Sequence, residues 1–266
     1  MLGPVTLAAD SFLDSVEFGN NSNSPFRMDS AITGPHTLTL GADTCIPARQ
    51  GSVQFGGDNS GWTGGLTALK NTHFVRIASP ASLPRGAISA PNGMRLRLKD
   101  NSLDWILSNA LSGPVKISIR HDHQNEDPSP RLLTLAGNTI APAAADGCGA
   151  LSIYSRLCLS NATLRLRLAE DANDRLEIIG AGEPPFVTLK NTALDIVCEH
   201  TPAPGKIFVI LQNHGAAPVR GIFNDPRGNP LPEGARVELP NNRAAILTYA
   251  HPFNNNATSI ALKITD

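Results

Sequence analysis

The sequence predicts an all-β protein in which short strands stack on one another as the laps of a β-solenoid. Three observations lead to this fold class: short apolar runs recur along the whole chain, turn-forming residues separate them, and two short motifs return in a similar context. With 266 residues the chain has the length of one large all-β domain or two smaller domains. A β-sandwich or jelly roll also has many short strands and turns, so it remains the alternative architecture.

The apolar runs have the pattern of half-buried strands. Most alternate apolar with polar positions, as in Met94 to Leu98, where arginines alternate with Met and Leu. Gly (23), Pro (21) and frequent Asn bound the runs and supply the backbone angles that turns require. Helix is expected only as a turn or two at 102–111 and 170–176. We expect strands at 37–40, 52–55, 74–77, 94–98, 115–119, 132–135, 164–168, 176–179, 187–189, 207–211, 237–239, 245–249 and 259–264.

Two repeated motifs favour the solenoid. The tetrapeptide LKNT at Leu69–Thr72 returns at Leu189–Thr192, and RLRL at Arg95–Leu98 returns at Arg165–Leu168. These intervals are compatible with a unit of roughly 20–30 residues, a period typical of coiled β structures. Each lap would hide the apolar face of the lap below and would pair its backbone groups along the stacking axis. About ten such laps are expected, at ~25 residues each and ~4.8 Å apart.

The charge balance limits the partners that we expect. The net charge is −1, and the 22 Lys and Arg residues are spread along the chain, so we expect no nucleic-acid partner. No apolar run approaches the ~20 residues of a membrane-spanning helix, so we expect no membrane insertion. The first ten residues lack the basic and apolar segments of a signal peptide. We therefore expect either a protein that is not exported or a chain that lacks its signal peptide, and we favour the second.

The four cysteines leave the redox compartment open. Cys45, Cys148, Cys158 and Cys198 form no CxxC motif, which disfavours a zinc ribbon or a thioredoxin-type site. Four cysteines allow three disulfide connectivities, and Cys148 and Cys158 are close enough in sequence to meet on neighbouring strands. Buried free thiols are an equal alternative.

A glycine-rich segment resembles a known repeat. A strand leads into a Gly-Asn-Ser-aromatic-Gly turn, a Gly-Gly pair and further strands, and a second, different pattern closes the chain. The first pattern comprises Gly57, Asn59, Ser60, Gly61, Trp62, Thr63, Gly64, Gly65, Val75, Leu83, Pro84 and Gly86; the second comprises Gly221–Asn224, Leu231–Ala235 and Val237. The first resembles the autotransporter-associated β-strand repeat, and the second resembles the closing segment of such proteins; together the resemblance covers about residues 30–100 and 150–266. The cysteines and the glycine-free stretch 122–130 depart from that pattern.

The resemblance implies a right-handed parallel β-helix that is secreted or displayed on the surface of a bacterium, as a released or excised portion of a larger protein. We expect the β-solenoid to occupy residues 1–220 and a C-terminal capping segment to occupy residues 221–266, where prolines and charged residues gather. The expected function is non-enzymatic: structural or adhesive, with self-association or assembly into filaments through exposed strand edges. A host surface or a polysaccharide is a further expected partner.

Three side chains are candidate ligand contacts. Trp62 lies in the glycine-rich turn and could stack on a sugar, although packing inside a corner is the more common role of such an aromatic residue. His121 and His123 flank Asp122 in the densest polar cluster, where a solvated loop is favoured over a metal or ligand site. The acidic run 170–174 is expected to be a turn rather than a calcium site. No catalytic residue, resident metal or cofactor is predicted.

Two other functions remain open at this stage. A polysaccharide lyase or glycosidase with a β-helix fold would need carboxylates about 5–9 Å apart in one groove. Asp100 with Asp104, or Asp10 with Asp14, are candidates by spacing alone. A phage-type fibre protein would instead require trimerisation. No GxSxG, P-loop, HExxH or GxGxxG motif is present.

Overall fold

The computed structural model describes residues 3–13, 26–41, 52–69, 74–99, 102–119, 129–143, 147–179, 187–198, 200, 202–240, 243–253 and 256–265. Within these ranges the chain is all-β, as predicted, and contains a short 3₁₀ turn, η1, at Pro80–Ser82. The two expected helical stretches are wrong. Residues 102–111 hold the strand Trp105–Leu107, in which Trp105 and Leu107 are buried and Ile106 is exposed, and 170–174 is a turn. No helix in the described part of the chain has the length and apolar character needed to cross a membrane.

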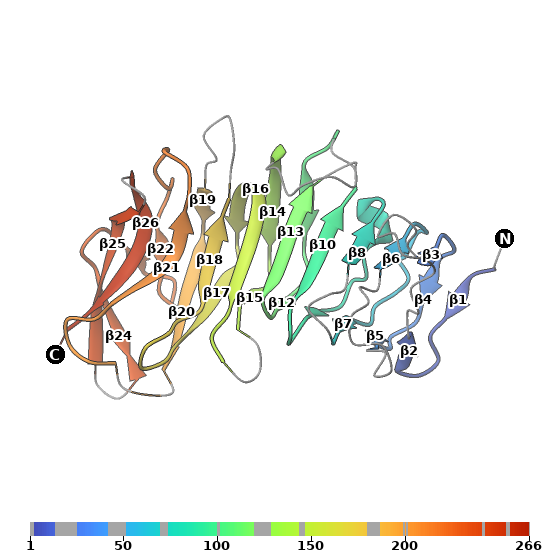
Figure 1. Ribbon diagram of the computed structural model, residues 1–266, viewed down its shortest axis with the longest axis horizontal. Helices are drawn as coiled ribbons and strands as arrows, with labels where there is room; N and C mark the ends of the chain where they lie inside the picture. Colours follow the sequence, from blue (N-terminus) through green and yellow to red (C-terminus); the bar gives the residue numbers. More distant parts are fainter. Residues whose placement is uncertain are drawn as a thin grey trace.

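The strands stack along the long axis of the molecule in sequence order (Figure 1). A ten-stranded sheet contains β2 (Ser11–Leu13), β5 (Leu38–Leu40), β7 (Leu66–Ala68), β9 (Ile88–Ser89), β12 (Leu111–Ser112), β15 (Thr139–Ala141), β17 (Thr163–Leu168), β20 (Thr192–Cys198), β22 (Phe223–Asn224) and β23 (Pro230–Leu231). All its pairings are parallel except that of β22 with β23.

A larger sheet contributes two further ladders. The main ladder contains β3 (Phe26–Met28), β6 (Ser52–Phe55), β8 (Phe74–Ile77), β10 (Met94–Leu98), β13 (Val115–Ile119), β16 (Ala150–Ser160), β18 (Arg175–Ile178) and β21 (Ile207–Asn213). The side ladder contains β11 (Trp105–Leu107), β14 (Ser129–Ala136), the second half of β16 and β19 (Val187–Lys190). Because β16 belongs to both, it joins the two ladders. A separate parallel pair, β1 (Val5–Thr6) with β4 (Ile32–Thr33), lies near the start of the chain.

Consecutive laps pair in register, so like side chains stack in columns. In the main ladder Val53 pairs with Val75, and Leu96 pairs with Ile117 one lap later. The lap length varies: 21 residues separate Leu96 from Ile117, whereas 36 separate Ile117 from Ile153, which occupies the same column. In the main ladder most laps thus fall in the predicted range and two exceed it, the second of which separates Leu176 from Leu211 by 35 residues.

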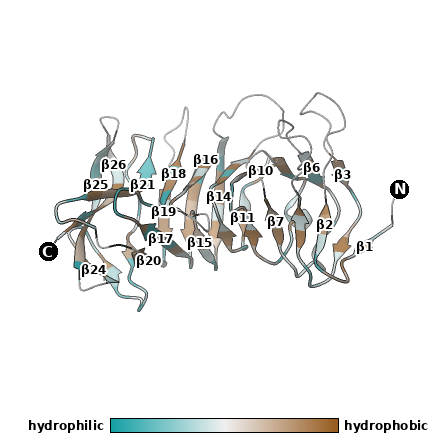
Figure 2. Ribbon diagram, turned by 60° about the horizontal axis from the view of Figure 1, so that its bottom comes forward, coloured by the Kyte–Doolittle hydropathy of each residue, from teal (hydrophilic) through white to brown (hydrophobic). Residues whose placement is uncertain are grey.

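The inward columns of all three ladders form one continuous apolar core. Its members run from Leu7 to Ile264, and most are fully buried. Figure 2 shows apolar residues along the strands from one end of the stack to the other. A strand with one narrow apolar face cannot hide that face alone, so each lap depends on its neighbours for burial.

The pairing changes from parallel to antiparallel at the C-terminal end of the stack. Strand β26 (Asn256–Ile264) pairs antiparallel with β21, β25 (Arg243–Phe253) pairs with β26, and β24 (Arg236–Leu239) forms the edge. The outward residues of β24 are Arg236 and Glu238, which form an ion pair of 2.9 Å. Charged side chains on a short edge strand discourage pairing with another chain.

Tyr249 links two elements of this end. Its hydroxyl accepts a hydrogen bond from the Phe223 amide at 2.8 Å and donates one to the Leu231 carbonyl at 2.7 Å. The rings of Phe223 and Tyr249 stack with centroids 6.3 Å apart. Burial raises the pKa of Tyr249 to about 12, although the hydrogen bond that its hydroxyl accepts from the Phe223 amide by itself lowers this pKa.

We predict that Tyr249 makes stability depend on pH in the alkaline range. The folded-state pKa is above the ordinary value of 10, so the stabilisation is complete below pH 10 and is lost as the pH rises towards about 12. Tyr249→Phe should remove this dependence, and near neutral pH it should cost roughly 1–3 kcal/mol because it leaves buried backbone groups unpaired. Urea unfolding of both proteins at several pH values measures this. Tyr154→Phe is the control, and an alkaline loss that persists in Tyr249→Phe would contradict the assignment.

Candidate functional site

The glycine-rich segment that resembles the repeat forms a corner between laps. The side chain of Asn59 is fully buried; its Oδ1 accepts from the Ile32 amide at 2.8 Å, and its Nδ2 donates to the Ser82 carbonyl at 2.8 Å. Asn59 therefore connects three successive laps. Asn109 has a similar role further along, donating to the carbonyls of Pro84 and Gly86.

Glycine in this corner is required by the close approach of neighbouring laps. A Cβ at Gly64 would lie 1.9 Å from the carbonyl oxygen of His36, and one at Gly86 would lie 2.3 Å from that of Gly64. These contacts are with backbone atoms, which cannot move aside without breaking the lap-to-lap pairing. The glycine pattern is thus explained by stacking.

Trp62 is placed inside the core rather than on the surface. Its side chain is fully buried, its ring lies 5.8 Å from that of Phe55, and its Nε1–H donates to the His36 carbonyl at 2.9 Å. This arrangement leaves no ring face for a sugar to stack on, and it agrees with the packing role. His121 and His123, the other two candidates, lie outside the described residues.

Three carboxylates that were possible catalytic or metal-binding groups accept backbone hydrogen bonds at other corners. Asp10 accepts from the Thr37 amide and Asp104 from the Leu132 amide, each at 2.8 Å and one lap away. Asp174 is buried and accepts from the amides of Gly149 and Arg167, both at 2.8 Å. The acidic run 170–174 is therefore a turn, as expected. Asp14 and Asp100 lie outside the described residues. Among the residues that the structure describes, no group of three His, Cys, Asp or Glu side chains is placed to hold a metal ion.

Three of the four cysteines are described, and all three are free thiols. Cys158 is buried, Cys148 and Cys198 are half-buried, and Cys45 lies outside the described residues. Cys148 and Cys158 lie at the two ends of one strand region rather than on neighbouring strands, so they cannot meet. Burial raises the pKa of the Cys198 thiol, which lowers its reactivity.

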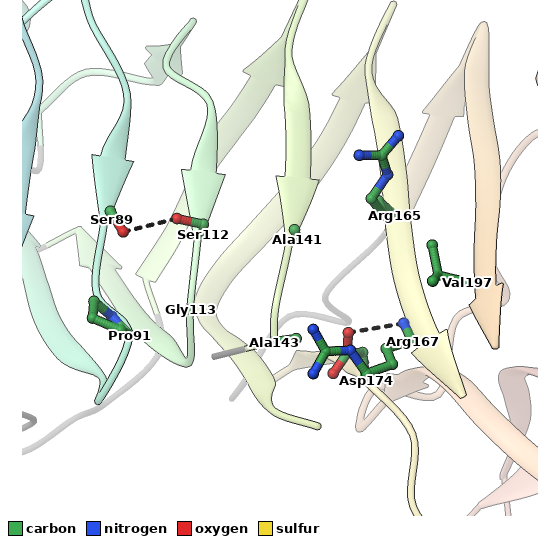
Figure 3. Close-up of a pocket in the computed structure, with 10 residues that line it drawn as sticks. All are labelled: Ser89, Pro91, Ser112, Gly113, Ala141, Ala143, Arg165, Arg167, Asp174 and Val197. Carbon is green, nitrogen blue, oxygen red and sulfur yellow. Dashed lines mark hydrogen bonds between the residues drawn. The ribbon is translucent and has the colours of Figure 1, made fainter. Parts of the chain in front are cut away.

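A groove of about 440 Å³ crosses the outer face of the ten-stranded sheet (Figure 3). Ser89, Ser112 and Ala141 occupy one column on successive strands, and their small size leaves the hollow. The Ser112 hydroxyl donates to that of Ser89 at 3.0 Å. Arg165 and Arg167 line the far end, and Arg165 forms an ion pair of 2.7 Å with Asp195.

The groove can bind polar groups, but it lacks the elements of a nucleophile and base. Both oxygens of Asp174 already accept backbone N–H bonds, and Arg165 is held by Asp195. What remains is a hollow with a mostly apolar lining, in which the paired serine hydroxyls and the two guanidinium groups are the other polar groups. The groove cannot be recognised in the sequence, because its lining residues span 108 positions from Ser89 to Val197 and only the strand register brings them together.

Comparison with protein-family models, with curated proteins and with solved structures finds no match to this chain.

We predict that the two hydrogen bonds of buried Asn59 contribute strongly to the stability of the fold. Asn59→Ala would leave the buried Ile32 amide and Ser82 carbonyl without these bonds, at a cost of roughly 1–3 kcal/mol or more. Asn92→Ala is the matched control, since Asn92 is exposed and makes one such bond, to the Leu69 carbonyl. Chemical unfolding measures both. Equal small effects would show that Asn59 does not hold the corner.

Proposed function

We propose that the chain is a right-handed parallel β-helix of the autotransporter-repeat type, with its coil in residues 1–220 and its cap in residues 221–266. Its proposed function is that of a non-enzymatic structural or adhesive protein outside a bacterial cell. Three features support the fold: parallel pairing in sequence order, one continuous core, and the general right-handedness of parallel crossovers. The residues of the repeat-like turn support the family, since Asn59, Trp62 and Gly64 have the corner roles that a stacked repeat needs.

The difference between the two ends of the stack carries the functional proposal. Among the described strands, β1, β2 and β3 at the N-terminal end each have a partner on one side only. Phe12 on β2 is 75% exposed there. At the other end the antiparallel strands finish with the ion-paired edge of β24. Unpaired backbone groups next to an exposed aromatic ring favour association with another chain, whereas charges at an edge oppose it.

Self-association is therefore expected at the N-terminal end, with a second copy of the chain as the partner. An interface that uses the same surface of both copies closes at two molecules, whereas a head-to-tail interface extends into filaments. The charged edge of β24 favours the closed pair. The enzyme alternative has less support, because the described corner carboxylates already accept backbone hydrogen bonds.

The expected result is a molecular mass that rises from one copy towards two with concentration, measured by light scattering. Phe12→Lys should weaken this association by about tenfold or more, because it places a charge where the interface would bury the apolar Phe12 ring. Ile106→Lys is the matched control, since Ile106 is 61% exposed but lies in the middle of the stack. A mass of one copy at every concentration would overturn the assembly, and fibres in electron micrographs would overturn the closed pair.

A further inference from the structure

The first lap of the stack presents one strand edge on each of its three sides (Figure 1). Strands β1, β2 and β3 pair in parallel with β4, β5 and β6 of the second lap. The lap has the same length on every side: 27 residues separate Val5 from Ile32, Ser11 from Leu38 and Phe26 from Val53. The three edges therefore follow one another in chain order around the N-terminal end of a regular coil.

The middle residue of β2 directs its backbone groups out of the stack. The Ser11 amide donates to the Thr37 carbonyl, and the Leu13 carbonyl accepts from the Gly41 amide, so both residues face the second lap. Successive residues of a strand direct their N–H and C=O groups to opposite sides. Those of Phe12 therefore point away from the second lap, towards the open end.

Strands β1 and β3 have the same arrangement. The amides of Val5 and Leu7 donate to carbonyls of the second lap, and the Met28 carbonyl accepts from an amide of that lap. By the same alternation, Thr6 on β1 and Arg27 on β3 direct their N–H and C=O groups outward. Each of the three edges thus offers one donor and one acceptor, and these groups have no hydrogen-bond partner among the described residues.

We propose that two copies of the chain pair around a two-fold axis through β2. Strand β2 then pairs antiparallel with the partner's β2, and β1 pairs with the partner's β3. This arrangement rests on the self-association proposed above and adds the identity of the strands that meet. In an interface of this symmetry the strand on the axis meets its own copy, and the other two meet reciprocally.

The rise of the coil selects the middle strand for the axis. A coil climbs by one strand spacing, ~4.8 Å, in each lap, so β1 projects furthest from the N-terminal end and β3 projects least. An axis through β2 sets the strand that projects furthest against the one that projects least, and the gaps at the three edges are then equal. An axis through β1 or β3 would hold one or more pairs of edges about two strand spacings apart, which is too far for backbone hydrogen bonds.

The side chains at these edges agree with the same axis. Phe12, which is 75% exposed in the single chain, would lie opposite the partner's Phe12 with both rings on one face. The contact removes apolar surface of both rings from water. The small Thr6 side chain would lie opposite the partner's Arg27. An axis through β3 would instead set two long Arg27 side chains opposite each other, each of them held by Asp29 in an ion pair of 3.2 Å.

Mixing two charge variants tests whether Phe12 meets its own copy. Phe12→Lys alone and Phe12→Glu alone should each associate about tenfold or more weakly than the unchanged chain, because like charges meet at the axis. A one-to-one mixture should associate about tenfold more tightly than either variant alone, since opposite charges then meet. Light scattering over a concentration series measures the association. Native mass spectrometry, with one variant labelled with nitrogen-15, separates mixed pairs from identical ones.

The matched controls are Thr6→Lys and Thr6→Glu, on the neighbouring strand of the same lap. In the proposed pair Thr6 does not meet its own copy, so mixing these two variants should give mixed pairs only at the statistical half. Thr6 and Phe12 are both exposed, so all four variants should keep the unfolding midpoint nearly unchanged.

The outcomes separate this arrangement from the self-association on which it rests. An unchanged chain that pairs, together with no preference for mixed pairs in the Phe12 set, would overturn the axis through β2 and leave self-association standing. A preference for mixed pairs in the Thr6 set alone would place the axis through β1. A mass of one copy for the unchanged chain at every concentration would overturn the self-association and this arrangement with it.

Discussion

The in-register parallel pairing of one lap with the next is the constraint on which the rest of the structure depends. It aligns Val53 with Val75 and Leu96 with Ile117, and thereby turns short strands, each too narrow for a core, into continuous apolar columns. The same register sets what lies outside. It brings two arginines side by side on the main ladder and collects small residues into the groove of the ten-stranded sheet.

Polar side chains at the corners complete what the strands leave unpaired. Asn59, Asp10 and Asp104 each accept a hydrogen bond from a backbone amide of an adjacent lap. At another corner the side chains of Asn161, Asn191 and Asn224 form a ladder with bonds of 2.8 and 3.0 Å. Asn161 and Asn191 adopt positive φ there, a conformation that Asn tolerates better than most residues. In the described part of the chain, the polar side chains named here thus hold adjacent laps together at the corners.

Local pattern predicted much of the fold, because alternation of apolar and polar residues depends only on near neighbours. The strands at Ser52–Phe55, Met94–Leu98 and Val115–Ile119 agree with the expected bounds. The longest strand of the parallel stack, Ala150–Ser160, was missed, because it passes from one ladder to another and is buried on both faces over much of its length. Its side chains therefore lose the alternation by which other strands are recognised. The groove was also missed, since its lining residues come together only once the register of distant laps is known.

The uneven spacing of the laps has a consequence for how such a chain can change. Ile117 and Ile153 share a column although 36 residues separate them, whereas 21 separate Leu96 from Ile117. The stack thus fixes which residues pair between laps, but it tolerates different numbers of residues in the connections between them. Insertions at the perimeter need not disturb the interior, so new peptide segments could be displayed at a chosen height on an unaltered scaffold.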